Sequence, residues 1–211
     1  MIIRKKEDSI EVLGTGFICH SKGYVISCAH TMNLTDELGV VSPQDINSFN
    51  PMTQERASFI PVTISQYDTQ NDVALLKLPD NTPVHAPPNI FGNAKTQEVG
   101  ASIACLGYPF AGFGQHTLKI TSGIVSSKVI TENGTRQFQI DAMIHDGNSG
   151  GPLIDLKTGK IIGVVSGRFS PAGNGGGMMV GNYQIGSESS IGLATTIQYA
   201  IELLKAEGIN V

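Results

Sequence analysis

The chain has 211 residues and carries 14 Lys or Arg residues against 18 Asp or Glu residues, a formal net charge of −4. This acidic balance argues against a nucleic-acid-binding protein, and no apolar run approaches the roughly 18 residues of a membrane-spanning helix. We therefore expect neither a nucleic-acid nor a membrane partner. Charged residues make up only 15% of the chain, glycines number 25 and tryptophan is absent, which favours a turn-rich β protein over a helical bundle.

The amino-terminal segment contains a basic cluster at residues 4–6 that is followed at once by an acidic pair at residues 7–8. Because these charges cancel, we interpret the segment as a solvated terminus. Residues 1–8 also lack the apolar core of a secretory signal, so we expect a cytosolic location.

The cysteines do not form a recognisable framework. Cys19, Cys28 and Cys105 are odd in number and lie inside apolar runs, so we expect buried thiols rather than disulfides. Together with His20 and His30, the first two suggest a zinc site. Cys19 and His20 would project to opposite faces of a strand, and neither pair has the usual ligand spacing, so we expect no metal site.

The first elements in chain order are two short strands within residues 11–27, joined by a turn at residues 21–23. The second strand ends at His30. Residues 31–53 are irregular, and we expect a loop there with one short helical turn.

An acidic residue stands at the entrance of the next apolar segment. Residues 57–67 resume strand character, and Asp72 precedes the nearly continuous apolar strand 73–78. A carboxylate that enters a buried strand is costly unless it is hydrogen-bonded. We therefore expect another group to donate to Asp72.

A proline-rich segment divides the chain. Residues 81–89 contain three prolines, which excludes a central strand and predicts a linker between two halves. Short strands are then predicted at residues 99–106, 117–126, 137–142, 152–154 and 160–166. The glycine- and serine-rich residues 170–190 predict a mobile loop, and the apolar spacing of residues 196–207 predicts a closing amphipathic helix. Two runs of short strands around a linker indicate paired β-barrels with a C-terminal helix.

The segment GNSGG is the most informative motif of the chain. Gly147, Gly150 and Gly151 surround Ser149 and allow a tight turn in which main-chain N–H groups point beside the hydroxyl. A nucleophile with an oxyanion hole requires this geometry. The alternative is a glycine-rich hairpin with an incidental serine.

An activated serine needs a base and a group that orients the base. The candidates are His30 and Asp72. Each has a structural alternative, a satisfied histidine after a strand and a turn-forming aspartate before one. Their occurrence together, in the chain order His, Asp, Ser, favours the catalytic interpretation.

The runs TGFICHSKGYVISCAH, YDTQNDVALLKL and IHDGNSGGPL resemble the three active-site segments of chymotrypsin-like serine proteases. GNSGGPL and NDVALLKL are most similar to the HtrA/Deg branch. The resemblance extends from about residue 12 to residue 204 and is weakest in residues 31–58 and 170–190.

The resemblance implies an all-β fold of two six-stranded antiparallel β-barrels, chymotrypsin-like, with a C-terminal α-helix. The whole chain, residues 1–211, would be one protease domain. Its first barrel would span about residues 1–85, its second barrel about residues 95–195 and its helix about residues 196–207.

The resemblance also assigns roles. It makes Ser149 the nucleophile, His30 the general base and then acid, and Asp72 the residue that orients His30. The N–H groups of Gly147 and Ser149 would form the oxyanion hole. No cofactor and no metal are implied.

Substrate selection would depend on residues around this turn. By resemblance, Met143 forms the base of the primary specificity pocket, and Ser166, Gly167 and Arg168 form the strand that pairs with the substrate backbone. An apolar Met143 implies cleavage after small or medium aliphatic residues. Arg168 replaces a residue that is small in many relatives, and it could narrow the pocket or reach an acidic side chain.

Two departures from the family concern control and recruitment. Asn148 stands where zymogen-type relatives have the aspartate that pairs with a new amino terminus, so we expect control through ordering of residues 145–147 by neighbouring loops or a second subunit. Only residues 208–211 of this sequence follow the predicted helix, so we expect no PDZ domain and no recruitment of substrates through their C-termini by such a domain. The sequence leaves a homo-oligomer open.

Two functions remain. The leading hypothesis is a serine endopeptidase that acts on exposed polypeptide. The alternative is a catalytically weak peptide-binding protein on the same scaffold. An ester hydrolase is disfavoured because the turn lacks the strand-to-helix setting of that fold.

Overall fold

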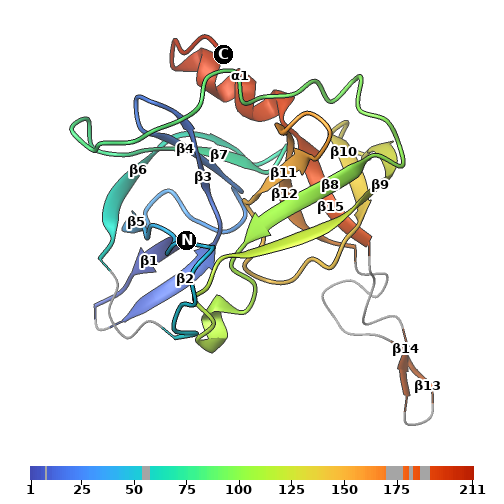
Figure 1. Cartoon of the computed structure of the whole chain (residues 1–211), viewed down its shortest axis with the longest axis horizontal. Helices are drawn as coiled ribbons and strands as arrows, with labels where there is room; N and C mark the ends of the chain where they lie inside the picture. The colour runs from blue at the N-terminus through green and yellow to red at the C-terminus, as the bar shows by residue number, and fades with distance from the viewer. Residues whose placement is uncertain (8, 54–57, 170–177, 181–182, 186–190) are drawn as a thin grey trace.

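The structure is a computed structural model that describes residues 1–7, 9–53, 58–169, 178–180, 183–185 and 191–211. For 178–180 and 183–185 it describes the backbone alone. Two β-sheet halves lie side by side, and a helix near the carboxyl end lies across the top of both in the view of Figure 1. The segment between β7 and β8, green in Figure 1, connects the first half to the second.

The first half is a seven-stranded antiparallel sheet with the order β2-β1-β5-β6-β7-β4-β3. Its strands are β1 (Ile2–Lys5), β2 (Ile10–Gly14), β3 (Phe17–His20), β4 (Tyr24–Ser27), β5 (Leu38–Val40), β6 (Ile60–Asp68) and β7 (Val73–Lys77). β4 and β7 are buried along nearly their whole length because both of their faces are covered. Within the described residues the sheet does not close between β2 and β3, whereas a closed six-stranded barrel was predicted.

Two segments of this half differ from the sequence-based expectation. Residues 2–5 form β1, in which Ile2 and Ile3 are each 1% exposed, whereas Lys5, Lys6 and Glu7 are exposed; the interpretation as a solvated terminus therefore holds for these three charged residues and is wrong for the strand and for Arg4. Arg4 is held by ion pairs to Glu11 at 3.1 Å and to Asp36 at 2.6 Å. The loop predicted at 31–53 contains β5, which pairs with both β1 and β6.

The second half is a closed antiparallel barrel with the order β10-β15-β12-β11-β8-β9. Its strands are β8 (Ser102–Gly107), β9 (Lys119–Ile130), β10 (Arg136–Asp141), β11 (Pro152–Asp155), β12 (Lys160–Arg168) and β15 (Ile191–Thr196). A short 3₁₀ turn, η1 (Ala111–Phe113), follows β8. The barrel core is apolar and includes Phe138, Ile140 and Leu153, each fully buried.

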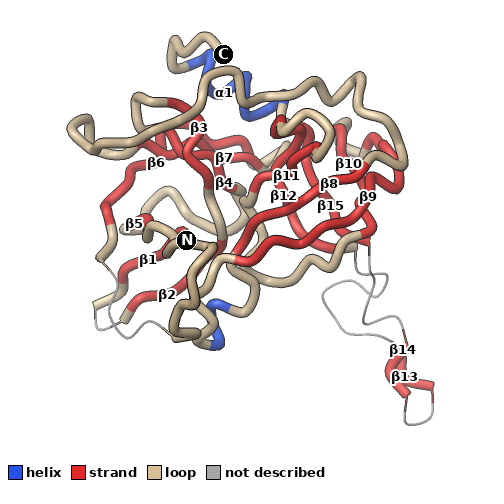
Figure 2. The backbone as a smooth tube through the Cα atoms, in the orientation of Figure 1, coloured by secondary structure: helices blue, strands red, loops and turns tan. Residues whose placement is uncertain are grey.

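The predicted mobile loop at 170–190 lies mostly outside the described residues. Its described parts are β13 (Met178–Val180) and β14 (Tyr183–Ile185), which pair with each other. They extend away from the two sheet halves in Figure 2.

The C-terminal helix is α1 (Gln198–Ala206). Ala200 and Leu204 on its buried face pack with Val73 and Leu75 of β7 in one cluster, so the helix of the second half covers the sheet of the first. No helix in the described part of the chain is long and apolar enough to cross a membrane. The all-β, chymotrypsin-like fold class with a closing helix is confirmed.

Candidate active site

Strand pairing brings His30 and Asp72 together. β4 ends three residues before His30, Asp72 immediately precedes β7, and the two strands pair through Ser27 and Ala74. The ring atom Nδ1 of His30 lies 2.9 Å from Oδ1 and 2.8 Å from Oδ2 of Asp72. The main-chain N–H of His30 also donates to Oδ1 at 2.9 Å. Asp72 thus has the donors that its position before a buried strand requires.

This pair has a clear electrostatic consequence. The hydrogen bond to Asp72, and then its charge, raise the pKa of His30, whereas partial burial acts in the opposite direction. Because the carboxylate can only accept, Nδ1 carries the proton and Nε2 is left as the basic nitrogen of the neutral ring. The His30 side chain is 49% exposed, so Nε2 can be reached from solvent.

The serine turn requires glycine at two positions. Gly147 has φ 97° and Gly150 has φ 86°, a region that disfavours other residues. A Cβ atom at Gly147 would lie 2.2 Å from the carbonyl oxygen of Tyr108, and one at Gly150 would lie 2.1 Å from that of Thr15. The turn itself is closed by a hydrogen bond from Asn148 N to the carbonyl of His145 at 3.0 Å.

Hydrogen bonds to main-chain carbonyls hold this turn against the first half. Thr15 N donates to the carbonyl of Ser149 at 2.8 Å. The carbonyl of Val165 accepts both Gly150 N at 2.7 Å and the Cys28 thiol, two residues before His30, at 3.1 Å. Ser149 therefore lies at the seam between the two halves, next to the segment that carries His30.

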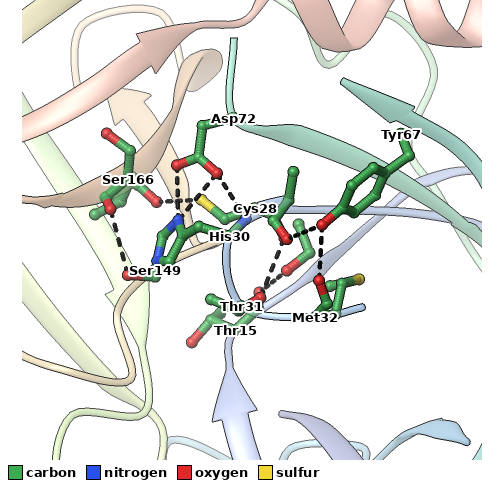
Figure 3. A network of polar contacts seen from close by, with 12 residues as sticks. Thr15, Cys28, His30, Thr31, Met32, Tyr67, Asp72, Ser149 and Ser166 are labelled. Carbon is green, nitrogen blue, oxygen red and sulfur yellow. Dashed lines mark hydrogen bonds and ion pairs between the residues drawn. The ribbon is translucent and has the colours of Figure 1, made fainter. Parts of the chain in front are cut away.

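The Ser149 hydroxyl is not yet engaged with the imidazole. It donates to the carbonyl of Ser166 at 3.5 Å, and among the described residues no hydrogen bond joins it to His30. Figure 3 shows Asp72, His30, Ser149 and Ser166 in one network of polar contacts. Catalytic hydrogen bonds are often long without substrate and shorten in the complex, so this geometry is compatible with proton transfer.

Two donors of the turn are unpaired. The main-chain N–H groups of Gly147 and Ser149 have no acceptor within the part of the chain that the structure describes. The carbonyl of Asp146 accepts Phe110 N at 3.2 Å, so the N–H of Gly147, on the same trans peptide, points the opposite way. Unpaired donors within two residues of a hydroxyl are what an oxyanion hole needs.

The residues expected to select substrate lie near this turn. Ser166 and Arg168 belong to the end of β12, where pairing with β11 has stopped at Val164. Among the described residues, no strand pairs with this edge of β12 beyond Val164. Met143 is 68% exposed, so its side chain is not enclosed as the base of a closed pocket would be.

One cluster has the chemistry of metal ligands. Single ligand atoms of Cys28, His30 and Asp72 lie within 4.8 Å of one another. Burial, and then the charge of Asp72, raise the pKa of the Cys28 thiol far above its usual range, and this thiol already donates to the carbonyl of Val165 at 3.1 Å. A metal ion needs the thiolate, and both oxygens of Asp72 are already in contact with His30, so these residues do not fit a resident metal.

Comparisons with known proteins show the family to which this fold belongs. A family model described as a trypsin-like peptidase domain matches residues 14–164. A Rickettsia conorii protein named "Probable periplasmic serine endoprotease DegP-like" is 34% identical over 205 residues, which cover 93% of this chain and 34% of that protein. "Magnetosome formation protease MamE" of Paramagnetospirillum magneticum is 29% identical over 170 residues, covering 78% and 21%.

A solved structure with the same fold is that of "HtrA-type protease AlgW with decapeptide". It matches with a TM-score of 0.68 and 23% identity, covering 94% of this chain and 52% of that one. The chain spans about a third of the length of the Rickettsia conorii relative.

The expectation of a cytosolic location is wrong. Relatives from Rickettsia conorii, Rickettsia prowazekii and Halomonas elongata are named as periplasmic serine endoproteases, which points to the periplasm. The lack of an apolar core in residues 1–8, on which that expectation rested, does not identify a compartment. The HtrA/Deg resemblance, in contrast, is confirmed. From the family model over residues 14–164 and the chymotrypsin-like fold that surrounds the serine turn, we conclude that the chain belongs to the trypsin-like peptidase family.

Proposed function

We propose that this chain is a serine endopeptidase that hydrolyses peptide bonds through an acyl-enzyme on Ser149. The observation that carries the proposal is the contact of His30 Nδ1 with both carboxylate oxygens of Asp72, at 2.9 and 2.8 Å. This contact keeps Nε2 of the neutral ring free for the serine proton. In the family, the same three residue types perform this chemistry in this chain order.

The reaction has two balanced halves. Ser149 Oγ attacks the carbonyl carbon of the scissile bond while its proton passes to His30 Nε2. The tetrahedral intermediate collapses, the C–N bond breaks, and His30 returns the proton to the leaving amine. Water then repeats the sequence on the ester and frees Ser149. Asp72 stabilises the imidazolium form of His30 in each half.

The oxyanion would be held by the N–H groups of Gly147 and Ser149. A donor of this kind commonly lowers the activation barrier by about 3 to 4 kcal/mol. The support for this role is that both groups lack an acceptor among the described residues. Control of activity would act on residues 145–147, which the neighbouring loop contacts in two ways. Phe110 N donates to the carbonyl of Asp146, and the rings of Phe110 and His145 have centroids 4.6 Å apart.

The substrate would be an extended polypeptide that adds to the open edge of β12 at Ser166, Gly167 and Arg168. The solved AlgW structure is described as containing a decapeptide, which is consistent with a peptide ligand. We propose cleavage after small or medium aliphatic residues, with Met143 at the primary pocket. Because Met143 is exposed, the substrate or a neighbouring segment of the chain would have to cover its side chain to form a pocket.

Degradation of casein by the pure protein tests the proposal. The wild-type chain should generate new peptides, and Ser149→Ala should generate none under the same conditions. Equal degradation by both proteins would assign the activity to a contaminant.

A second candidate function is peptide binding with little turnover. The observation in its favour is that the Ser149 hydroxyl donates to Ser166 rather than to His30. This candidate predicts that an extended peptide binds equally to wild type and Ser149→Ala and is recovered intact from both.

A further inference from the structure

Thr15 connects the first half of the molecule to the serine turn. It lies between β2 and β3, far from Ser149 in the sequence, and is only 2% exposed. Its hydroxyl donates to the carbonyl of Gly147 at 2.6 Å, and its main-chain N–H donates to the carbonyl of Ser149 at 2.8 Å. One residue therefore binds both of the residues whose N–H groups are proposed to hold the oxyanion.

The direction of the Thr15 hydroxyl is fixed by a third group. The N–H of Tyr108 donates to Thr15 Oγ1 at 3.2 Å. Because a hydroxyl has a single proton, accepting this bond leaves that proton for the carbonyl of Gly147. Tyr108 N also approaches the carbonyl of Gly147 directly, but at 3.4 Å, which is longer than the usual 2.7–3.2 Å. The strong anchor of this carbonyl is thus the threonine side chain.

The carbonyl of Gly147 lies on the peptide between the two proposed oxyanion donors. The N–H on that peptide, from Asn148, is bonded to His145, so the peptide is held at both ends. A glycine at φ 97° has many other main-chain conformations available. If the carbonyl loses its partner, the turn can rotate, and the N–H groups of Gly147 and Ser149 no longer converge.

We propose that Thr15 is a positioning residue for this peptidase: its hydroxyl holds the oxyanion turn in the active conformation from across the seam. This inference rests on the proposed function and adds a control point that lies outside the turn and its own loop. Ser27 supports it in turn, because its hydroxyl donates to the carbonyl of Thr15 at 2.7 Å.

The test compares two substitutions at this position. Thr15→Val keeps the shape of the side chain but removes both hydrogen bonds, whereas Thr15→Ser keeps both. We expect Thr15→Val to lower kcat by about 10- to 100-fold, part of the loss seen when an oxyanion donor is removed. KM should change by less than about twofold, because the hole is used only in the transition state. Thr15→Ser should restore kcat to near the wild-type value.

The matched control is Thr195→Val. Thr195 is a threonine of β15 that is 0% exposed, and its hydroxyl has no hydrogen-bond partner among the described residues. Removing this hydroxyl should leave kcat and KM unchanged. A kcat for Thr15→Val within twofold of wild type would overturn the proposal, as would equal losses in Thr15→Val and Thr15→Ser.

A crystal structure of Thr15→Val tests the same contact without turnover. The proposal predicts that the carbonyl of Gly147 turns away from its wild-type direction. An unchanged turn would overturn the inference even if the enzyme were inactive for another reason. Conversely, a wild-type protein without turnover would refute the proposed peptidase activity. The comparison of the wild-type and Thr15→Val structures would still test whether the Thr15 hydroxyl holds the turn.

Discussion

The substitution Asp72→Asn exchanges a single atom at the centre of the proposed mechanism. Asp72 Oδ1 accepts the main-chain N–H of His30, and Oδ2 accepts the ring Nδ1 at 2.8 Å. In the variant, the amide oxygen is expected to keep the main-chain N–H, which places the amide NH₂ against Nδ1. The NH₂ can only donate, so Nδ1 loses its proton and Nε2 gains it. The ring is then in the tautomer that cannot accept the serine proton.

The expected loss for this variant is about 10⁴-fold in kcat, or about 5.4 kcal/mol of transition-state stabilisation. The fold should survive, because Asp72 has φ 56° and asparagine tolerates this left-handed conformation well. Steady-state kinetics on a peptide substrate near pH 7, with urea unfolding as the stability control, measure both effects. A loss below tenfold in a folded variant would refute the proposed role of the Asp72 carboxylate.

Three further predictions concern the turn, the base and the pocket. Gly147→Ala should lower kcat by about 10²-fold because its Cβ would meet the carbonyl of Tyr108 at 2.2 Å; Gly134→Ala, also at positive φ but with no neighbour within 4 Å, should retain activity. Because Asp72 raises the pKa of His30 and the base must be neutral, kcat/KM should fall as pH drops through a value above the ordinary imidazole pKa of about 6.5; a midpoint below 6 would contradict this. A peptide library should give cleavage mainly after Val, Ala or Leu, and dominance of Arg or Lys would rule out the proposed role of Met143.

The sequence predicts the strands that bury a continuous apolar run. β4, β7 and β12 were expected from such runs, and the helix at 198–206 from its apolar spacing. Short edge elements were missed. β5 has three residues and exists because β1 and β6 flank it, so only tertiary pairing identifies it.

Charge alone also misled the interpretation of the first residues. Arg4 was expected in solvent, but its side chain on β1 is ion-paired to Glu11 of the neighbouring strand β2 and to Asp36, which comes from a loop 32 residues away. Local charge patterns cannot reveal a partner at that separation.

The site was predictable to the extent that its chemistry is local. The surrounding glycines identified Ser149, the position before an apolar strand identified Asp72, and the position at the end of a strand identified His30. The structure brings His30 and Asp72 into contact. Thr15 was not found. A threonine between two strands carries no sequence signal, and its role depends on a carbonyl that lies 132 residues further along the chain.

Covalent labelling with a fluorophosphonate, followed by mass-spectrometric localisation, tests the central claim most directly. The reagent reacts with a serine hydroxyl only where a base and an oxyanion hole activate it. We predict one adduct on Ser149 in the wild-type protein and none in His30→Ala. Labelling at another residue, or equal labelling of His30→Ala, would contradict the proposed active site.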